Sequence, residues 1–385
     1  MSKRVCFILD WYPTPKNNGC QFVKTLIYAM ADKGITCDVI APIIYIPGKI
    51  DRKDAPYHRI EKTKKGNIIN IYMPMYFHAG SNKWTIRLSM NSHFRTALHV
   101  IYKEKLNPNC IYGHFIYQAG LTAARIGKNM GIPAYCACGE SSTRLAPDGA
   151  IHNIGLKYGN WRKILAEMTG VICVSSYNKT LLTQSCYFPD SCAIEVFPNG
   201  VDKTRFRPID RKEARERLHF PKNAFIVSFT GAFSERKGYN RLCDALSRCD
   251  GVASVFLGRG QKNESLKNVL FAGPVPNEEV PNYLCASDVF VLPTNGEGCC
   301  NAIVEALACG IPVVSSNLPF NDDILNADNS IRIDVSNVDE IVNAITMISQ
   351  NSELRKQLSI HTEKASQIID IDERVDKICE FMGVK

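Results

Sequence analysis

The sequence predicts an α/β protein made of two doubly wound domains, each a mostly parallel sheet covered by helices. The chain has 385 residues and a hydrophobic content of 45%, which is more than one hydrophobic core usually fills. Apolar runs of strand length alternate with amphipathic segments from one end of the chain to the other. That alternation is typical of parallel strands joined by crossover helices.

The expected strands fall into two series. The first is Val5–Leu9, Thr36–Ala41, Cys110–Phe115, Ala134–Cys138 and Val171–Ser175. The second is Phe225–Thr230, Ser254–Leu257, Val269–Ala272, Val289–Pro293 and Pro312–Ser315. Turn-forming residues between Pro198 and Pro208 separate the two series. We therefore expect domains at residues 1–200 and 201–365, and a helix within 366–385 that packs back on the first domain.

The cysteine content and the N-terminus indicate a cytoplasmic protein. The 16 cysteines are scattered, with no paired spacing typical of a disulfide framework or a zinc site. We expect them to be reduced and buried. The apolar run near the N-terminus is short and ends at Asp10, which suits a first strand better than a signal peptide. No stretch of the sequence is long and apolar enough to span a bilayer.

The basic excess belongs to the N-terminal half. Residues 1–200 contain 24 Lys and Arg against 12 Asp and Glu, whereas the remaining 185 contain 22 against 26. Solvated surface lysine is the commonest cause of such an excess. A basic excess also suggests an anionic partner, such as a phospholipid surface or a pyrophosphate-linked lipid. Nucleic acid is less favoured because no recognised binding module accompanies the basic half.

Ligands of parallel sheets bind at the carboxyl ends of the strands, so we expect the functional residues in the loops that follow the strands. Gly19 lies after the first strand and precedes a helix, where it would let the backbone approach a phosphate or sugar. His114 stands at the end of the third strand, beside a glycine that we expect to be flexible. Arg236 and Lys237 precede a glycine and a helix, and could neutralise a leaving diphosphate. Taken singly, each of these features is more often structural or solvated.

The loop after Val289–Pro293 carries the strongest signal, because Glu297 and Glu305 bracket an expected helix start at Asn301. The free backbone N–H groups and positive dipole end of that helix would point at an anion held beside Gly298, Cys299 and Cys300. Glu305, one turn into the helix, could accept hydrogen bonds from both hydroxyls of a ribose. Glu297 could hold a sugar on the far side of the phosphates. An isolated pair of glutamates would most often be an acidic residue at a helix start and an ordinary surface residue. The functional interpretation therefore depends on the motifs that accompany the pair.

Together these segments resemble the family-4 retaining glycosyltransferases, which have the GT-B fold. The resemblance is carried by four segments in matching order and spacing, and is strongest from about residue 195 to 320. They are Pro198 to Asp202, Gly231 to Gly238, Ala286 to Pro293, and Glu297 to Ser316. One position departs from the pattern: many relatives have Arg straight after the first glycine of the second segment, where this chain has Ala232.

The resemblance implies a role for each matching residue. Lys237 and Arg236 would contact the donor phosphates, with Arg236 as the candidate replacement for the arginine missing at Ala232. Glu305 would hold the ribose, and Glu297 would hold the transferred sugar. The backbone from Gly298 through Cys299 and Cys300 to Asn301 would also contact the transferred sugar, and Val275 would contact the base. Gly19 would close over the donor, and His114 would lie near the reacting face of the sugar. The catalytic residues expected are His114, Lys237 and Glu297.

The activity implied is transfer of a hexose or N-acetylhexosamine from a nucleotide-diphosphate sugar, with a UDP-sugar expected, to a glycan or lipid-linked acceptor in surface polysaccharide synthesis. No carboxylate is obviously placed as a nucleophile, and the family is thought to retain configuration by attack on the face that the phosphate leaves. Catalysis would then be largely electrostatic. No cofactor and no metal are expected, because the only Asp-x-Asp, at Asp370 to Asp372, lies far from these motifs.

The acceptor is expected on the N-terminal half, whose basic excess and segment Tyr76–Arg95 suit a lipid-linked, anionic substrate at the inner face of the membrane. The alternative for that segment is ordinary helix packing with its cations in water. Two other functions stay open. One is a catalytically silent GT-B subunit, suggested by Ala232, and the other is a sugar-nucleotide 2-epimerase, which the motif order fits less well.

Overall fold

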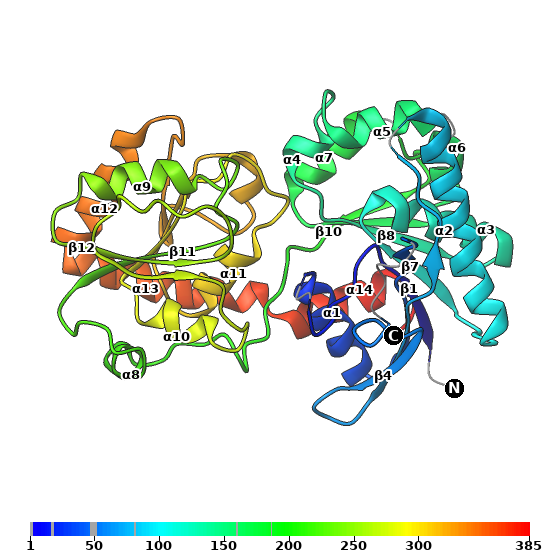
Figure 1. The fold of residues 1–385 in the computed structure, drawn as a ribbon, viewed down its shortest axis with the longest axis horizontal. Helices are drawn as coiled ribbons and strands as arrows, with labels where there is room; N and C mark the ends of the chain where they lie inside the picture. Colours follow the sequence, from blue (N-terminus) through cyan, green and yellow to red (C-terminus); the bar gives the residue numbers. More distant parts are fainter. Residues whose placement is uncertain (1–2, 17–18, 47–51, 81, 159–160, 186) are drawn as a thin grey trace. The chain divides into compact units, whose positions relative to one another are not determined.

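The computed structural model describes residues 3–16, 19–46, 52–80, 82–158, 161–185 and 187–385. The chain divides into two compact units (Figure 1). The first unit comprises residues 1–197 and 372–385, and the second comprises residues 198–371. Each unit is a doubly wound α/β structure, so the predicted fold class is confirmed.

The described strands of the first unit form a sheet of eight in which every neighbouring pair but one is parallel. Its spatial order is β10 (Ala193–Val196), β9 (Gly170–Cys173), β8 (Ala134–Cys138), β7 (Cys110–His114), β1 (Arg4–Ile8), β2 (Thr36–Ile40), β5 (Ile68–Tyr72) and β4 (His58–Lys62). The exception is the antiparallel pair β4 and β5 at one edge. A small parallel pair, β3 (Ile43–Ile44) and β6 (Met75–Tyr76), lies outside this sheet.

Helices cover both faces of this sheet, so its central strands are buried: every residue of β7 and β8 is buried, and His114 is the one charged-type side chain among them. The helices of this unit are α1 (Gln21–Asp32), α2 (Lys83–Lys103), η1 (Ile116–Gly120), α3 (Leu121–Met130), α4 (Ser142–Leu145), α5 (Ala150–Tyr158), α6 (Trp161–Leu165), α7 (Ser176–Ser185) and α14 (Ile371–Phe381). The last of these, red in Figure 1, packs within this unit. Its Phe381 ring lies 5.6 Å from the Tyr135 ring, and Lys33 Nζ lies 2.6 Å from Asp376 Oδ2.

The second unit has a fully parallel sheet among its described strands. The order is β13 (Val269–Gly273), β12 (Val252–Leu257), β11 (Phe225–Thr230), β14 (Val289–Leu292), β15 (Val313–Ser316) and β16 (Ser330–Ile333). Its helices are α8 (Arg211–Arg217), α9 (Tyr239–Ser247), α10 (Val280–Cys285), α11 (Asn301–Ala308), η2 (Pro319–Asn321), α12 (Val338–Gln350), α13 (Ser352–Ala365) and η3 (Ser366–Ile369). The strand order reverses between β11 and β14, so the loops that follow these two strands meet at the switch point where doubly wound sheets bind ligands.

All ten expected strands are present, with ends shifted by at most two residues. Of the strands that the sequence did not predict, β3 and β6 have two residues each, and β4 and β10 have no buried residue; β5 and β16 are partly buried and were missed all the same. The edge strand β4, for instance, alternates between exposed and half-buried residues, so it has no continuous apolar run to recognise. The cysteines in the described part of the chain are free, and all are buried or half-buried.

Candidate functional site

Two loops of the second unit contact each other at the switch point through hydrogen bonds and close packing. They are residues 231–238 after β11 and residues 293–300 after β14. The backbone N–H of Asn295 donates to the Arg236 carbonyl at 2.8 Å, and the Thr294 hydroxyl oxygen lies 3.1 Å from the same carbonyl oxygen. Gly238 has a φ of +76°, and a Cβ added there would lie 2.1 Å from the Pro293 carbonyl oxygen. The predicted cations and the predicted acidic loop therefore belong to one rigid structure.

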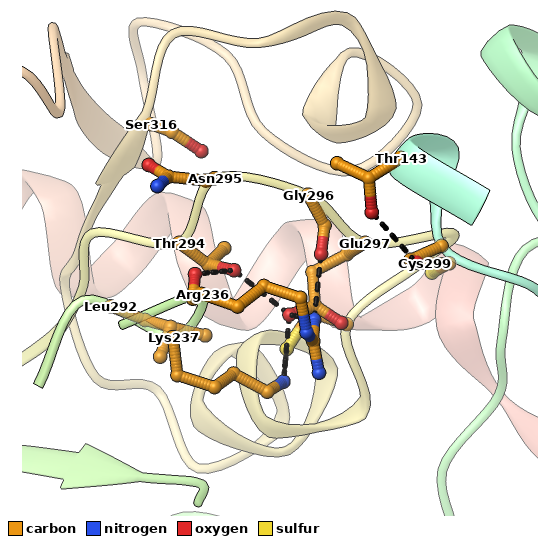
Figure 2. A network of polar contacts seen from close by, with 12 residues as sticks. Thr143, Arg236, Lys237, Leu292, Thr294, Asn295, Gly296, Glu297, Cys299 and Ser316 are labelled. Carbon is orange, nitrogen blue, oxygen red and sulfur yellow. Dashed lines mark hydrogen bonds and ion pairs between the residues drawn. The ribbon is translucent and has the colours of Figure 1, made fainter. Parts of the chain in front are cut away.

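Glu297 is the centre of this structure, as Figure 2 shows. Its Oε1 accepts from Arg236 Nη1 at 2.7 Å, from Lys237 Nζ at 2.7 Å and from the Thr294 hydroxyl at 2.9 Å. The Glu297 side chain is 12% exposed. A buried carboxylate needs such partners to offset the cost of losing water. Among the described residues no hydrogen bond reaches Oε2, so that oxygen is left for another donor.

The two cations differ in exposure. The Arg236 side chain is 45% exposed and also donates to the Gly296 carbonyl at 2.7 Å. The Lys237 side chain is 14% exposed, and its Nζ lies 3.8 Å from Cys300 Sγ. Burial lowers the pKa of Lys237, but Cys300 and Glu297 raise it by more, so the net shift is upward. Lys237 is therefore a nearly buried, fixed ammonium group.

Helix α11 begins at Asn301, where the sequence predicted a helix start. Cys300 is the N-cap residue, with no side-chain capping hydrogen bond, and no acidic residue stands in the first turn. The positive end of the helix dipole is therefore not offset by a carboxylate of its own first turn. Gly298 and Cys299 are buried in the preceding loop, and Asn199 Nδ2 supports this loop by donating to the Cys299 carbonyl at 2.9 Å.

Glu305 lies one turn into α11 and is half-buried. Burial raises its pKa to about 7, although Arg205 and Lys237 act to lower it. Its carboxylate makes no hydrogen bond or ion pair within the described ranges, so both oxygens are available as acceptors.

Val275 is half-buried in the loop after β13. In the sheet, β12 lies between β13 and β11, so this loop does not follow a strand next to the switch point.

The other two predicted residues, His114 and Gly19, belong to the first unit. His114 ends β7 and is 3% exposed, with Nδ1 3.2 Å from the Tyr112 hydroxyl and Nε2 without a hydrogen-bond partner in the part of the chain described. Burial, with a contribution from Arg374, lowers the pKa of His114 to about 3, so the ring is neutral at pH 7. The expectation of a flexible glycine beside it is wrong: a Cβ at Gly113 would lie 2.7 Å from the Ala119 carbonyl oxygen, so Gly113 serves close packing. Gly19 is exposed shortly before α1.

The structure thus brings seven of the predicted residues onto two adjoining loops and the helix start that follows: Arg236, Lys237, Glu297, Gly298, Cys299, Cys300 and Asn301. Sequence reasoning missed the supports of this cluster, Thr294 and Asn199. Asn199 belongs to a motif segment that the sequence singled out, but its partner is one hundred residues away. Thr294 carries no motif that would have found it.

Residues 210–365 match the family described as Glycosyl transferases group 1. The chain is 25% identical over 358 residues to the putative teichuronic acid biosynthesis glycosyltransferase TuaC of Bacillus subtilis (strain 168), covering 89% of this chain and 88% of that protein. It is 29% identical over 241 residues to the UDP-Gal:alpha-D-GlcNAc-diphosphoundecaprenol alpha-1,3-galactosyltransferase of Escherichia coli, covering 57% of this chain and 61% of the relative. The fold matches that of Anabaena HepE, solved in complex with UDP, with a TM-score of 0.73 and 16% identity over 99% of this chain and 100% of that one. These findings support a glycosyltransferase with the GT-B fold.

Proposed function

We propose that the protein is a family-4 retaining glycosyltransferase that moves a hexose or N-acetylhexosamine from a nucleotide-diphosphate sugar to a glycan or lipid-linked acceptor. One observation carries the proposal: two cations converge on one oxygen of Glu297 at the switch point, directly before a helix start that has no acidic residue in its first turn. The cluster holds a net positive charge beside the N-terminal end of α11, where the helix dipole is positive, which suits a diphosphate.

Each residue of the cluster has a proposed role. Lys237 and Arg236 bind the diphosphate, with Arg236 taking the place of the arginine that relatives carry at Ala232. The unused Oε2 of Glu297 accepts from a hydroxyl of the transferred sugar, and Glu305 accepts from the ribose. The base contact of Val275 and the donor contacts of Gly19 and His114 stay predictions that rest on the resemblance.

The proposed chemistry is a displacement with retention. The bond between the sugar's anomeric carbon and the phosphate oxygen breaks, and its electron pair leaves on the diphosphate. The acceptor hydroxyl attacks from the same face and gives its proton to the departing phosphate oxygen. Negative charge grows on the diphosphate as the bond breaks, so Lys237 and Arg236 stabilise the transition state more than the ground state. In this proposal the charge stabilisation requires no metal. We expect full transfer in the presence of a chelator. A strict need for Mg²⁺ or Mn²⁺ would contradict the metal-independent mechanism.

We propose UDP as the nucleotide of the donor. The name of the Escherichia coli relative specifies UDP-galactose, and HepE was solved with UDP. The same relative's name specifies a lipid-diphosphate acceptor, and TuaC is named for the synthesis of a surface polymer. A lipid-linked acceptor in surface polysaccharide synthesis follows as the proposal for this chain, with the protein in the cytoplasm at the inner membrane face.

Thermal unfolding with UDP-, GDP- and ADP-sugars tests the donor proposal. Ligand at about one hundred times its dissociation constant should add roughly 2.7 kcal/mol to the free energy of unfolding. We expect a selective shift with UDP-sugars that Glu305→Ala largely removes. If no nucleotide sugar stabilises the protein, the proposed transferase site is wrong, and a silent GT-B subunit becomes the better interpretation.

A further inference from the structure

The first unit contains a cavity of about 610 Å³ at the carboxyl ends of β1, β2, β5, β7 and β8. Doubly wound sheets bind ligands at this edge, so the position is that of a binding site. Its lining is mostly apolar and aromatic, with Tyr76 and Phe115 among the contributors. Flat faces of this kind pack against sugar rings, which have apolar C–H faces.

Two carboxyl groups that line the cavity have oxygen atoms without partners. Glu140 follows β8 and is 3% exposed; its Oε1 accepts from the Ile116 backbone N–H at 2.6 Å, and its Oε2 is buried with no hydrogen bond in the described residues. Asp10 follows β1, and its Oδ1 is likewise buried and unpartnered. Unsatisfied buried oxygens are costly, so their persistence indicates a ligand that completes them.

Both groups are held toward the protonated form. Burial raises the pKa of Glu140, and it raises the pKa of Asp10 well above its ordinary value, with the charge of Glu140 adding to the shift at Asp10. A protonated carboxyl group can donate one hydrogen bond and accept others, as a sugar hydroxyl does.

Carboxyl groups outnumber guanidinium groups around the cavity, in contrast to the basic excess of this half of the sequence. Asp10, Asp54 and Glu140 line it, against the guanidinium of Arg144 and the imidazole of His78. The Asp54 carboxylate accepts from the Thr14 hydroxyl at 2.8 Å and from the Lys16 backbone N–H at 3.0 Å. A phosphate placed here would meet one guanidinium and three carboxyl groups, and it would be repelled by each carboxyl group that is ionised, which disfavours binding.

The backbone beside the cavity is strained. Phe115 has a φ of +75°, and Gln118 has a φ of +56° with a ψ of −69°. Neither is a glycine, and such conformations tend to occur at binding and catalytic sites. Gln118 is buried, and its side-chain amide exchanges hydrogen bonds with the Tyr76 hydroxyl at 3.2 to 3.3 Å. This strained turn fixes the wall of the cavity next to the Glu140 carboxyl group, which bonds to Ile116.

We propose that this cavity binds the sugar end of the acceptor as an uncharged, hydroxyl-bearing ring, and that Asp10 and Glu140 determine specificity by hydrogen bonding to its hydroxyl groups. The inference rests on the proposed transferase function and narrows its acceptor: the sugar that enters the first unit carries no phosphate or carboxylate. Any anionic group of the acceptor stays outside this cavity.

Ligand-detected NMR titration of the full chain, with and without UDP, tests the proposal. The probes are the methyl glycosides of glucose, galactose and N-acetylglucosamine, each compared with its 6-phosphate. We expect at least one neutral glycoside to bind at least about tenfold more tightly than its phosphate. Binding of no neutral glycoside, or tighter binding of the phosphates, would overturn the proposal.

Glu140→Gln and Asp10→Asn test the two residues while keeping side-chain shape and a carbonyl acceptor. Each should weaken binding of the neutral glycoside by about tenfold or more, since leaving a buried donor or acceptor without its partner costs about 1–3 kcal/mol. Each should also reduce the ratio of glycoside affinity to phosphate affinity. Asp148→Asn is the matched control, because it removes one negative charge at an exposed position outside the cavity. An unchanged glycoside affinity in both cavity variants would assign the site to other residues and refute the proposal.

Stabilisation by UDP separates this inference from the proposed function and shows that the variants are folded. If UDP stabilises wild type and variants alike while no glycoside binds, the cavity proposal fails and the transferase proposal stands. If glycosides bind as expected and no nucleotide does, the transferase proposal fails and the cavity is a sugar site of another kind.

Discussion

Single residues hold the proposed diphosphate site of the second unit together. Glu297 Oε1 forms ion pairs with Arg236 and Lys237, and the Thr294 hydroxyl lies within hydrogen-bond distance of the same oxygen. A nearly buried Lys237 without a carboxylate would bear the full cost of lost hydration. The ion pairs offset that cost and hold both cations at the place where we propose that the diphosphate binds.

Lys237→Ala should lower sugar transfer by about a hundredfold or more, the loss typical of removing one donor to a developing negative charge. Glu297 keeps Arg236 and Thr294 as partners, so the fold should survive. Lys222→Ala is the control, because Lys222 forms an exposed pair with Glu216 in the same unit. Steady-state transfer assays of both variants give the comparison, and wild-type turnover in Lys237→Ala would remove this residue from the mechanism.

Glu305 should make the stability of the protein depend on pH. Its pKa is about 7 in the folded protein against an ordinary 4.5, so the folded state holds the proton more tightly. The stability that this proton contributes is therefore fully present below about pH 4.5 and is lost as the pH rises through 7. Relative to Glu305→Gln, wild type should lose about 1 kcal/mol of unfolding free energy between pH 6 and pH 8. Urea unfolding at the two pH values measures this, and parallel pH profiles would show that Glu305 does not titrate in this range.

At the scale of elements, the site depends on two loops that share one backbone framework. Gly238 closes the β11 loop and is the N-cap of α9, where its positive φ and its contact with Pro293 leave no room for a side chain. Arg241, in the first turn of α9, donates to the Pro293 carbonyl at 2.9 Å and to Asn295 Oδ1 at 3.1 Å. The loop that carries the cations can therefore shift only together with the loop that carries Glu297.

Gly238→Ala should destabilise the protein by about 2 kcal/mol or more and also weaken nucleotide-sugar binding, because the new methyl group would push the two loops apart. Gly251→Ala separates the cost of backbone strain from the cost of the contact with Pro293. Gly251 has a similar φ of +74°, with no atom within 4 Å of the added Cβ, so it reports backbone strain alone. Equal losses of stability in the two variants, measured by urea unfolding, would show that the contact with Pro293 does not matter.

At the scale of the whole molecule, no helix in the described ranges is both long enough and apolar enough to cross a membrane. The first unit exposes large apolar side chains on β6, next to β6 and at the start of α2, and β6 contacts α2. We call this set the apolar patch; its members are Met75, Phe77, Trp84 and Leu88, each 41–74% exposed. Exposed Lys83 and Arg95 lie on the same helix. Apolar side chains beside cations suit an anionic membrane surface.

We predict that the protein binds phosphatidylglycerol vesicles at low salt and phosphatidylcholine vesicles much less. Trp84→Ser combined with Leu88→Ser should reduce vesicle binding by at least about tenfold, since burying each side chain is worth roughly 1.5–3 kcal/mol. Ile68→Ser is the control, because Ile68 is 53% exposed on β5, outside the apolar patch. Vesicle sedimentation measures the effect. If the protein does not sediment with anionic vesicles, the membrane contact should be dropped.

Local patterns were sufficient to predict much of the fold and part of the candidate site. Buried strands such as β7 and β8 are mostly apolar because helices cover both faces of their sheet, so short runs of sequence identify them. The start of α11 at Asn301 was found in the same way, from a turn followed by a run of helix-forming residues. The edge strand β4 was missed because exposure on its outer side removes that pattern.

The sequence by itself determined where ten of the strands and the start of α11 lie, and which loops follow those strands, because these depend on periodicity and turn chemistry within a few residues. Only the tertiary structure decided which side chains meet. The pairing of Lys237 with Glu297 depends on β11 and β14 being neighbours, and the gathering of Asp10 and Glu140 around one cavity depends on the order β8, β7, β1. Strand order is set by packing across the whole sheet, so no local pattern records it.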